Sequence, residues 1–225
     1  MPITLDATST GEITNATSHS FSHTVGTAAR YTALFAAASL REDGSATLPA
    51  NIVATYNGVA MTQVGEYGNA TWKIAVALFY LLKPTAGANT LAFSWSNASL
   101  GGFYGISLYG VSYNNPIRTS SYTAGTGASI DVPSAVADRV LDVISAESPF
   151  GGTVSMTVGA GQTAIMNDEI QRSVNMAYGG SYEAGASGNV TMSWTKSVSN
   201  CLMAGMSVVP ASGARAVAVS PFLSF

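Results

Sequence analysis

The chain contains two histidines, His19 and His23, the residue type that metal sites and general acid–base catalysis use most often. They lie four residues apart in a segment rich in serine, threonine and asparagine, which is expected to be extended. Strand rise then separates them by about 13 Å, too far for one metal ion to bind both. No cysteine or carboxylate pattern accompanies them, and neither lies in a nucleophile motif. We therefore expect two ordinary surface histidines, no metal site, and no Ser-His-Asp or Cys-His catalytic apparatus.

The chain has 12 acidic residues, so two carboxylates could in principle form the pair that a glycosidase uses. Most of them lie in turn-like contexts, where acidic residues are ordinary solubilising groups, and we expect no catalytic pair. Asn167-Asp168-Glu169 could hold a Ca²⁺ ion at a loop, but a single acidic turn is weak evidence, so no metal or cofactor is expected. The candidate carboxylates are Glu42 with Asp43, Glu66, Asp131, Asp142, Glu147, and Asp168 with Glu169.

The single cysteine, Cys201, lies beside Leu202 and Met203 in an apolar stretch. This setting is typical of a small buried hydrophobic side chain rather than a reactive thiol, and one cysteine excludes an intrachain disulfide. Several aromatic residues are expected at strand ends or in loops. There they could stack on sugars, or equally belong to a core or an interface. They are Tyr67, Trp72, Tyr104, Tyr113, Tyr122 and Tyr182.

Composition argues against several classes of function. Hydrophobic residues make up 47% of the chain and charged residues only 9%, with 23 glycines, which suits short strands and turns. The net charge is −3 and the basic residues are scattered, so we expect no nucleic-acid binding. The longest apolar run, Ile74 to Leu82, is about half the length of a membrane helix, and the first residues lack a secretory-signal pattern. We expect synthesis in a cytoplasm, no membrane insertion, and a low-charge surface that meets other protein.

Alternation of apolar with small or polar residues predicts that antiparallel strands position these side chains. Strands are expected at residues 30–40 and 71–82, the second apolar on both faces and therefore covered on both sides. Asn57-Gly58, flanked by alternating residues, predicts a hairpin with a type I′ turn. Residues 89–111 and 188–210 each predict a hairpin that carries a tryptophan.

The second half of the chain repeats the order of the first. Ser94-Trp95 aligns with Ser193-Trp194, and residues 105–108 align with residues 205–208 as Gly-x-Ser-x segments. The alignment also places Arg139-Val140-Leu141 opposite Arg30-Tyr31-Thr32. Chance similarity among strands rich in glycine and serine is the alternative, but four segments match in order, which favours a true repeat.

The repeat predicts an all-β fold, an antiparallel β-sandwich of jelly-roll-like type with two pseudo-repeated halves. Each copy would have too few strands to close a core alone. We expect a sandwich domain at residues 23–210, with pseudo-repeats at 23–116 and 127–210. An N-terminal arm or edge strand is expected at residues 1–22, and a C-terminal tail at 211–225. Between the sheets we expect to find Leu91, Phe93, Trp95, Val190, Met192 and Trp194.

The order of these motifs resembles a β-sandwich module of tailed-bacteriophage virion structural proteins, which is also found in some bacterial surface proteins. The resemblance runs from His23 to Pro210 and rests on HTVGTAARYTALFAAASL, VATYNGVAMTQVG, ALFYLLKPTAGANTLAFSW, GISLYGVSYNNPI, VGAGQT and VTMSW…AGMSVVP. These motifs consist of turn glycines, core tryptophans and strand-ending prolines, so they bear on fold more than on activity. The resemblance implies a non-enzymatic virion or surface building block that packs against its neighbours.

We therefore expect a structural protein on the surface of a bacteriophage particle, and most specifically one that decorates or cements the capsid. Its partners would be other virion proteins, such as the major capsid protein or tail proteins, and further copies of itself. The alternative is a carbohydrate- or receptor-binding module of a tail fibre or tail tip, and an enzyme acting on surface polysaccharide ranks third. The apolar residues expected to dock on partners are Phe21, Val217, Val219, Phe222, Leu223 and Phe225.

Overall fold

The computed structural model describes residues 1–27, 31–42, 47–148, 153–171, 175–197 and 200–212. This part of the chain contains strands and no helix, and its strands pair antiparallel throughout, which confirms the all-β sandwich prediction. The strands are β1 (Thr4–Val25), β2 (Ala33–Glu42), β3 (Val53–Tyr56), β4 (Val59–Ala60), β5 (Thr62–Asn69), β6 (Ile74–Leu82), β7 (Gly87–Tyr109), β8 (Ile117–Gly125), β9 (Ser129–Ser134), β10 (Arg139–Ser148), β11 (Met156–Val158), β12 (Thr163–Ile170), β13 (Asn175–Ala184), β14 (Gly188–Lys196) and β15 (Asn200–Val208).

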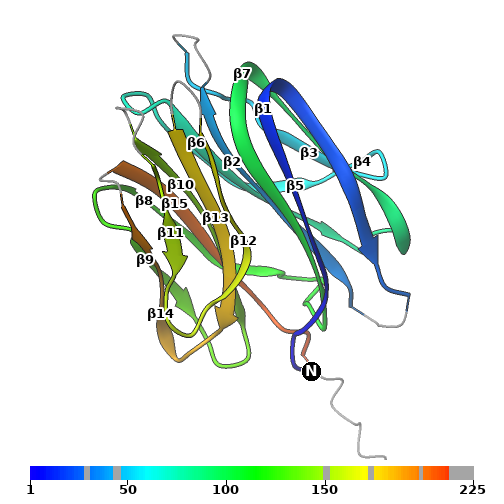
Figure 1. Ribbon diagram of the computed structural model, residues 1–225. Helices are drawn as coiled ribbons and strands as arrows, with labels where there is room; N and C mark the ends of the chain where they lie inside the picture. Colours follow the sequence, from blue (N-terminus) through cyan, green and yellow to red (C-terminus); the bar gives the residue numbers. More distant parts are fainter. Residues whose placement is uncertain (28–30, 43–46, 149–152, 172–174, 198–199, 213–225) are drawn as a thin grey trace, which may run out of the picture.

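The first half is built around β1 and β7, which pair with each other along almost their whole lengths and arch over together (Figure 1). Register shifts in β1 between residues 14 and 18 mark the bend. On one side of the bend the two strands join β2, β6 and β5 in the order β5-β6-β2-β7-β1, which we call the inner sheet of the first half. Beyond the bend they join β3 and β4 in its outer sheet. Residues 1–22 therefore form most of an edge strand within the fold.

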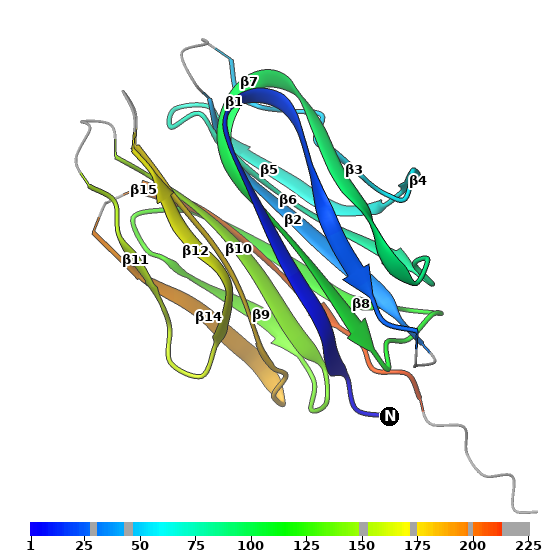
Figure 2. The same cartoon turned by 45° about the vertical axis from the view of Figure 1, so that its right-hand side comes forward.

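The second half has the same plan with separate strands in place of the arched pair. Its inner sheet has the order β12-β13-β10-β15-β8, and its outer sheet has the order β11-β14-β9. The inner sheets of the two halves pack face to face, and the outer sheets lie on the two outsides (Figure 2). The molecule is thus a stack of four β layers.

Each half has a hydrophobic core of its own, so the prediction that neither could close a core alone is wrong. One core lies between inner and outer sheets of the first half and includes Leu91, Phe93 and Trp95. A second includes Val190, Met192 and Trp194 in the other half. All six residues are buried as predicted, but in two cores rather than one. In the first half, β1 and β7 each contribute to both layers, which closes a sandwich with few strands; in the second half, the separate outer sheet β11-β14-β9 covers the core.

The repeat is visible in the strand register. Ala33 pairs with Leu108 in the first half as Arg139 pairs with Val208 in the second. The sequence alignment of Arg139 with Arg30 was therefore wrong by three residues. The shared feature is the turn before each strand, where Tyr31 (φ 63°) and Ala137 (φ 76°) occupy equivalent left-handed positions.

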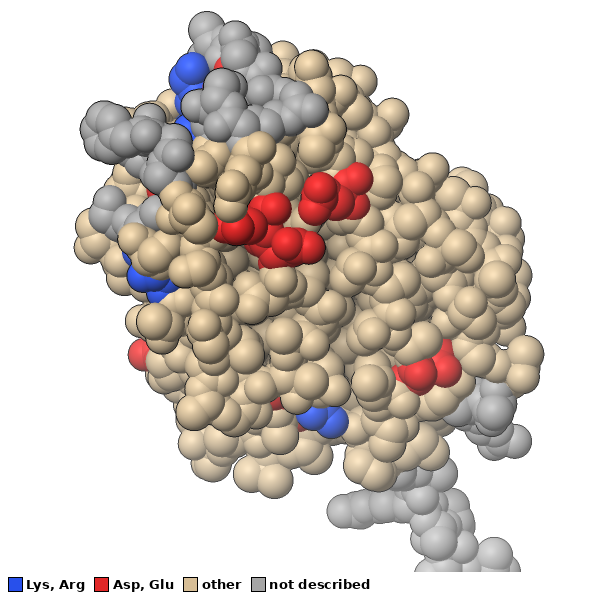
Figure 3. Space-filling model, viewed as in Figure 1, with Lys and Arg blue, Asp and Glu red and all other residues tan. Residues whose placement is uncertain are grey.

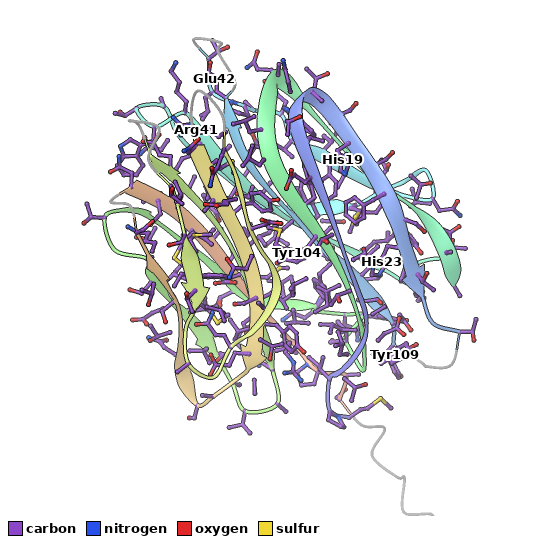
Figure 4. All side chains as sticks on the ribbon, viewed as in Figure 1. His19, His23, Arg41, Glu42, Tyr104 and Tyr109 are labelled. Carbon is purple, nitrogen blue, oxygen red and sulfur yellow. The ribbon has the colours of Figure 1, made fainter. Side chains whose placement is uncertain are left out.

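A third hydrophobic core lies between the two inner sheets and joins the halves. Tyr178 packs over Gly102, and Tyr104 packs over Gly180, so closely that a Cβ atom on either glycine would overlap the facing ring. Tyr104 lies in the middle of the molecule between the halves (Figure 4). At the end where Arg41 lies, its guanidinium meets Glu147 at 2.8 Å and donates to the carbonyl of Asn175 at 2.8 Å. Arg41 and Glu147 occupy equivalent positions in the two halves by register.

The two halves differ most in the polarity of their own cores. In the second half the carboxylate of Asp142 is fully buried and accepts hydrogen bonds from the indole nitrogen of Trp194 and from the backbone and hydroxyl of Ser181, each at 2.7 Å. The first half has Ala36 and Phe79 at the positions of Asp142 and Ser181. Accordingly, the indole nitrogen of Trp95 is buried with no hydrogen-bond partner among the described residues.

The two tryptophans provide a matched test of this difference. Trp194→Phe removes a hydrogen bond to a buried charged group, so we expect the free energy of unfolding to fall by about 1.5–3 kcal/mol more than for Trp95→Phe, which loses no hydrogen bond. Urea unfolding at pH 7 followed by circular dichroism measures both variants. Equal losses in the two variants would show that the contact with Asp142 is not worth a hydrogen bond.

Candidate functional site

The two histidines are part of the interior of the first half, and the surface prediction is wrong for His23. His23 is 1% exposed, and its Nδ1 is 2.7 Å from the hydroxyl of Ser9. His19 is half-buried, and its ring stacks on Phe103 with centroids 5.3 Å apart. The signal that could have found this burial is the strict alternation of SHSFSHTV at residues 18–25, which puts His19, Phe21, His23 and Val25 on one face of a strand.

A Ser–His pair beside an aspartate suggests a catalytic triad, but the geometry does not make one. The carboxylate of Asp6 accepts its hydrogen bonds from the hydroxyls of Ser107 (2.7 Å) and Tyr109 (2.6 Å) and from the backbone of Gly26 (2.9 Å), and none of these bonds comes from His23. The second ring nitrogen of His23 is buried without a partner in the described chain. A general base of that kind needs both an orienting carboxylate and access to substrate. This cluster fastens β1 to β7, and Figure 4 shows His23 and Tyr109 toward the end of the first half where β1 begins.

Burial sets the protonation of these groups. It lowers the pKa of His23 to about 4, against a smaller opposing effect of the charge on Asp6. Burial also raises the pKa of Asp142 to about 6, although Trp194 and Ser181 donate to it. For Asp6, burial alone would raise the pKa, but the hydrogen bonds from Tyr109, Gly26 and Ser107 lower it below its usual value.

Most candidate carboxylates interact with other groups of the protein. Glu147 pairs with Arg41, and Glu42 lies 3.4 Å from the ammonium of Lys73. Glu66 accepts from the backbone of Ile52 and from the side chain of Gln63, both at 3.0 Å. Asp131 accepts from the hydroxyl of Thr191 at 2.5 Å. Asp142 lies in the centre of β10 rather than in a turn, and Asp43 lies outside the described residues.

The metal and thiol predictions have different outcomes. Residues 167–169, expected at a loop, lie within strand β12, so that expectation is wrong. No group of three potential metal-binding side chains occurs in the part of the chain that the structure describes. Cys201 is buried, its sulfur lies 3.1 Å from the carbonyl of Gly127, and burial raises its pKa. The prediction of a buried cysteine is confirmed.

The aromatic candidates separate into core and surface residues. Tyr104 is fully buried within β7 rather than at a strand end, and Trp72 and Tyr182 pack partly buried against the core between the inner sheets. Tyr122 is 61% exposed and stacks on Tyr67 with centroids 4.3 Å apart.

A second surface group of aromatic residues lies where the chain passes from one half to the other. The rings of Tyr31 and Tyr113 lie 5.2 Å apart, and the ammonium of Lys83 lies 5.1 Å from the centre of the Tyr113 ring. These three side chains line a cavity of about 320 Å³ together with Ser112, Asn114, Ala211 and Ser212.

The largest of the described cavities lies between the two halves, where β1 of the first half runs beside β12 of the second. Its volume is about 440 Å³, and the lining residues include Thr10, Glu12, Asp168 and Tyr178. The hydroxyl of Tyr178 donates to the carboxylate of Glu12. Burial, this hydrogen bond and the nearby charges of Glu12 and Asp168 raise the pKa of Tyr178, which keeps the hydroxyl protonated. We call this cavity the β1–β12 groove.

Carboxylates gather around the β1–β12 groove. Asp168 and Glu169 line a smaller adjoining cavity of about 180 Å³ on β12. Figure 3 shows acidic side chains grouped near the centre of this face of the molecule, with other charged side chains scattered farther from them. Sequence reasoning named Asp168 and Glu169 but missed Glu12, because only the packing of the two halves brings β1 next to β12.

Of the residues predicted to dock on partners, only Phe21 lies among the residues that the structure describes. Phe21 is half-buried and packs on the core of the first half, with its ring 6.3 Å from that of Phe93. The others, Val217, Val219, Phe222, Leu223 and Phe225, lie outside the described residues, so their role stays a prediction.

Comparison of the chain with protein-family models, curated proteins and solved structures finds no match. Among the described residues, no helix is long and apolar enough to cross a membrane.

The two shifted buried groups predict opposing effects of acid on stability. Between pH 6.5 and 4 the unfolded chain binds a proton at His23 that the folded chain does not, which lowers the free energy of unfolding by up to about 3 kcal/mol. As the pH falls below 6, Asp142 binds a proton in the folded chain before it does so in the unfolded chain. This raises the free energy of unfolding by a similar amount, about 3 kcal/mol. The two effects should nearly cancel in the wild type.

Replacing either group should leave the effect of the other visible in the pH dependence of stability. We expect Asp142→Asn to lose stability steadily from pH 6.5 to pH 4, and His23→Gln to gain stability as the pH falls from 6 to 4. Urea unfolding at half-unit pH steps gives the slopes, which report the proton linkage even if a variant is less stable overall. Parallel pH profiles for the wild type and both variants would refute the assignment.

Proposed function

We propose that the chain is a non-enzymatic structural protein of a bacteriophage particle, placed on the particle surface as a capsid decoration or cement protein. The observation that supports this proposal is that the polar side chains with shifted pKa values interact within the protein. Asp142, His23, Asp6 and Arg41, polar side chains whose pKa values are shifted, all make internal contacts that hold strands and halves together.

The character of the exposed surface supports the same proposal. On the outer sheet of the first half, the exposed positions of β1 and β7 carry small uncharged residues, among them Ser20, Ser22, Thr24, Thr90 and Ser94. A surface with so little charge gives weak self-repulsion and favours packing against other protein. A capsid protein, a tail protein or a further copy of the chain is the partner that such a surface suits.

The fold changes how assembly is expected to occur. The N-terminal segment expected to reach a neighbouring subunit as an arm is paired to β7 within its own chain. Its contribution to assembly would therefore be as a strand edge, while residues 213–225, which follow the anchored Ala211, would be the segment that reaches a neighbour.

Virus particles provide the test of the proposal. An antibody raised against the recombinant chain should label the outside of particles purified from cells that make the protein, at regular positions in electron micrographs. Mass spectrometry of the same particles should find the chain in fixed proportion to the capsid protein. Particles that lack the chain would overturn the proposal.

The cavity beside Tyr31 and Tyr113 favours a second candidate, a carbohydrate- or receptor-binding module. Its volume of about 320 Å³ falls in the range of small-ligand sites. Tyrosine rings at the surface, here an exposed Tyr31 and a half-buried Tyr113, can stack on sugars, and the neighbouring amide, hydroxyl and ammonium groups can donate hydrogen bonds to them. On this hypothesis the protein would bind a cell-surface glycan.

This candidate predicts that Tyr31→Ala and Tyr113→Ala each weaken binding of an oligosaccharide by about tenfold, or about 1.4 kcal/mol. A glycan array would identify the oligosaccharide, and isothermal titration calorimetry would measure its affinity. Tyr122→Ala is the matched control, because Tyr122 is an exposed tyrosine that stacks on Tyr67 and does not line this cavity. The absence of any glycan that binds the wild type, or equal weakening in all three variants, would dismiss the site.

A further inference from the structure

The two halves meet along two edges. These edges are equivalent by the repeat, but they carry different side chains. At one, β5 lies beside β8; at the other, β12 lies beside β1. The strand registers make Tyr67 equivalent to Asp168, and Tyr122 equivalent to Thr10. Where Tyr67 and Tyr122 stack and fill the first edge, Asp168 and Thr10 leave the β1–β12 groove open at the second.

The strand that borders the β1–β12 groove has an unused edge. β1 pairs only with β7, so the hydrogen-bonding groups on its other side have no partner strand in the described chain. Between Thr4 and Val25 it has no lysine, arginine or proline, the residues that commonly protect a sheet edge. Such an edge accepts an added strand from another segment of chain.

The charge of the groove selects the kind of segment that would bind there. Glu12 and Asp168 line it, and Glu169 lies next to it with one carboxylate oxygen buried and without a hydrogen-bond partner in the described chain. None of the three salt bridges found among the described residues includes these carboxylates. A segment with a positive charge and strand-forming residues complements both the groove and the edge.

The chain itself contains such a segment after Ser212. Residues 213–225 read GARAVAVSPFLSF, with one arginine and no acidic residue. Arg215 is followed by the alternation of alanine and valine that suits a strand with one covered face. Residues 215–220 are thus the basic, strand-forming stretch that the groove requires.

The position at which this segment begins decides whether it can bind the groove of its own chain or only that of another copy. Ala211 accepts a hydrogen bond from the N-terminal amine of Met1 at 3.0 Å and donates to the carbonyl of Gly110 at 2.7 Å, next to the start of β1. Glu12 lies about 26 Å further along β1 than Thr4. Arg215 follows Ser212 by three residues, which span at most about 11 Å. Even with its long side chain, Arg215 cannot reach the groove of its own chain.

We propose that the β1–β12 groove binds residues 213–225 of another copy of this chain, added as a strand to the free edge of β1 with Arg215 between Glu12 and Asp168. The proposal rests on the proposed role in particle assembly and identifies the contact through which copies associate. Because the donor segment and the receiving groove are different surfaces, the contact is head-to-tail. Repetition of such a contact gives closed rings or continuous arrays.

Charge exchange tests this contact directly. Light scattering coupled to size-exclusion chromatography should find the full chain in assemblies larger than a monomer. Arg215→Glu alone and Asp168→Lys alone should each raise the concentration needed for assembly by roughly fivefold or more, and the double variant should restore it. Asp131→Lys, an exposed acidic position on the outer sheet of the second half, is the matched control and should behave as the wild type.

A labelled peptide of residues 213–225 provides a second measurement. It should bind a chain that stops after Ser212, and the binding should weaken with salt and with Asp168→Lys. A monomeric full chain, an assembly unchanged by removal of residues 213–225, or an assembly insensitive to Asp168→Lys would each overturn the proposal. These results are independent of particle labelling, so a chain found in particles but insensitive to charge exchange would keep the virion role and lose this contact.

Discussion

The packing of the two inner sheets against each other decides the architecture, because it joins two halves that already have cores of their own. The two inner sheets are equivalent by the repeat, so a residue of one sheet packs against the sheet that contains its own equivalent in the other half. Large residues at equivalent positions near the middle of this contact would therefore compete for the same space. The halves avoid this by divergence: Tyr178 packs on Gly102, while Gly102 has Leu202 as its equivalent in the other half. Interior packing density tolerates few voids or overlaps, so each substitution constrains the one it faces.

The same reasoning applies to the charges at one end of this interface. Arg41 and Glu147 occupy equivalent positions and meet each other; two arginines or two glutamates there would leave like charges buried together. Replacing one partner of a buried pair costs far more than replacing both, so the pair specifies this arrangement of the two halves more than it stabilises it. In the second half, the donors to Asp142 come from β13 in the inner sheet and β14 in the outer sheet. That carboxylate therefore couples two layers that are apolar at the equivalent place in the first half.

Much of the fold could be predicted from alternation and from the internal repeat, because both are local properties of the chain. The hairpin at Asn57-Gly58 and the buried tryptophans follow from them. The three-residue error at Arg139 arose because a sequence match weighs residue type, whereas register depends on the left-handed turn that Tyr31 and Ala137 share. The separate cores could not be predicted without knowing that β1 and β7 bend from one sheet into another. The groove between β1 and β12 was beyond sequence reasoning for the same reason, since its lining residues on the two strands lie more than 150 positions apart along the chain.

Divergence between the repeats also determines how many edges the molecule can offer to a neighbour. Two identical halves would present two equivalent meeting edges, both open or both closed. Here the stacked rings of Tyr67 and Tyr122 occupy the space above one edge, and a strand added there would have to displace them from their mutual contact. At the other edge, Thr10 and Asp168 leave that space open beside the free edge of β1. Of the two edges at which the halves meet, only this one is open to a neighbour, which favours ordered, directional association there over branching aggregation. A duplicated β fold thereby avoids the main hazard of carrying long unpaired strands.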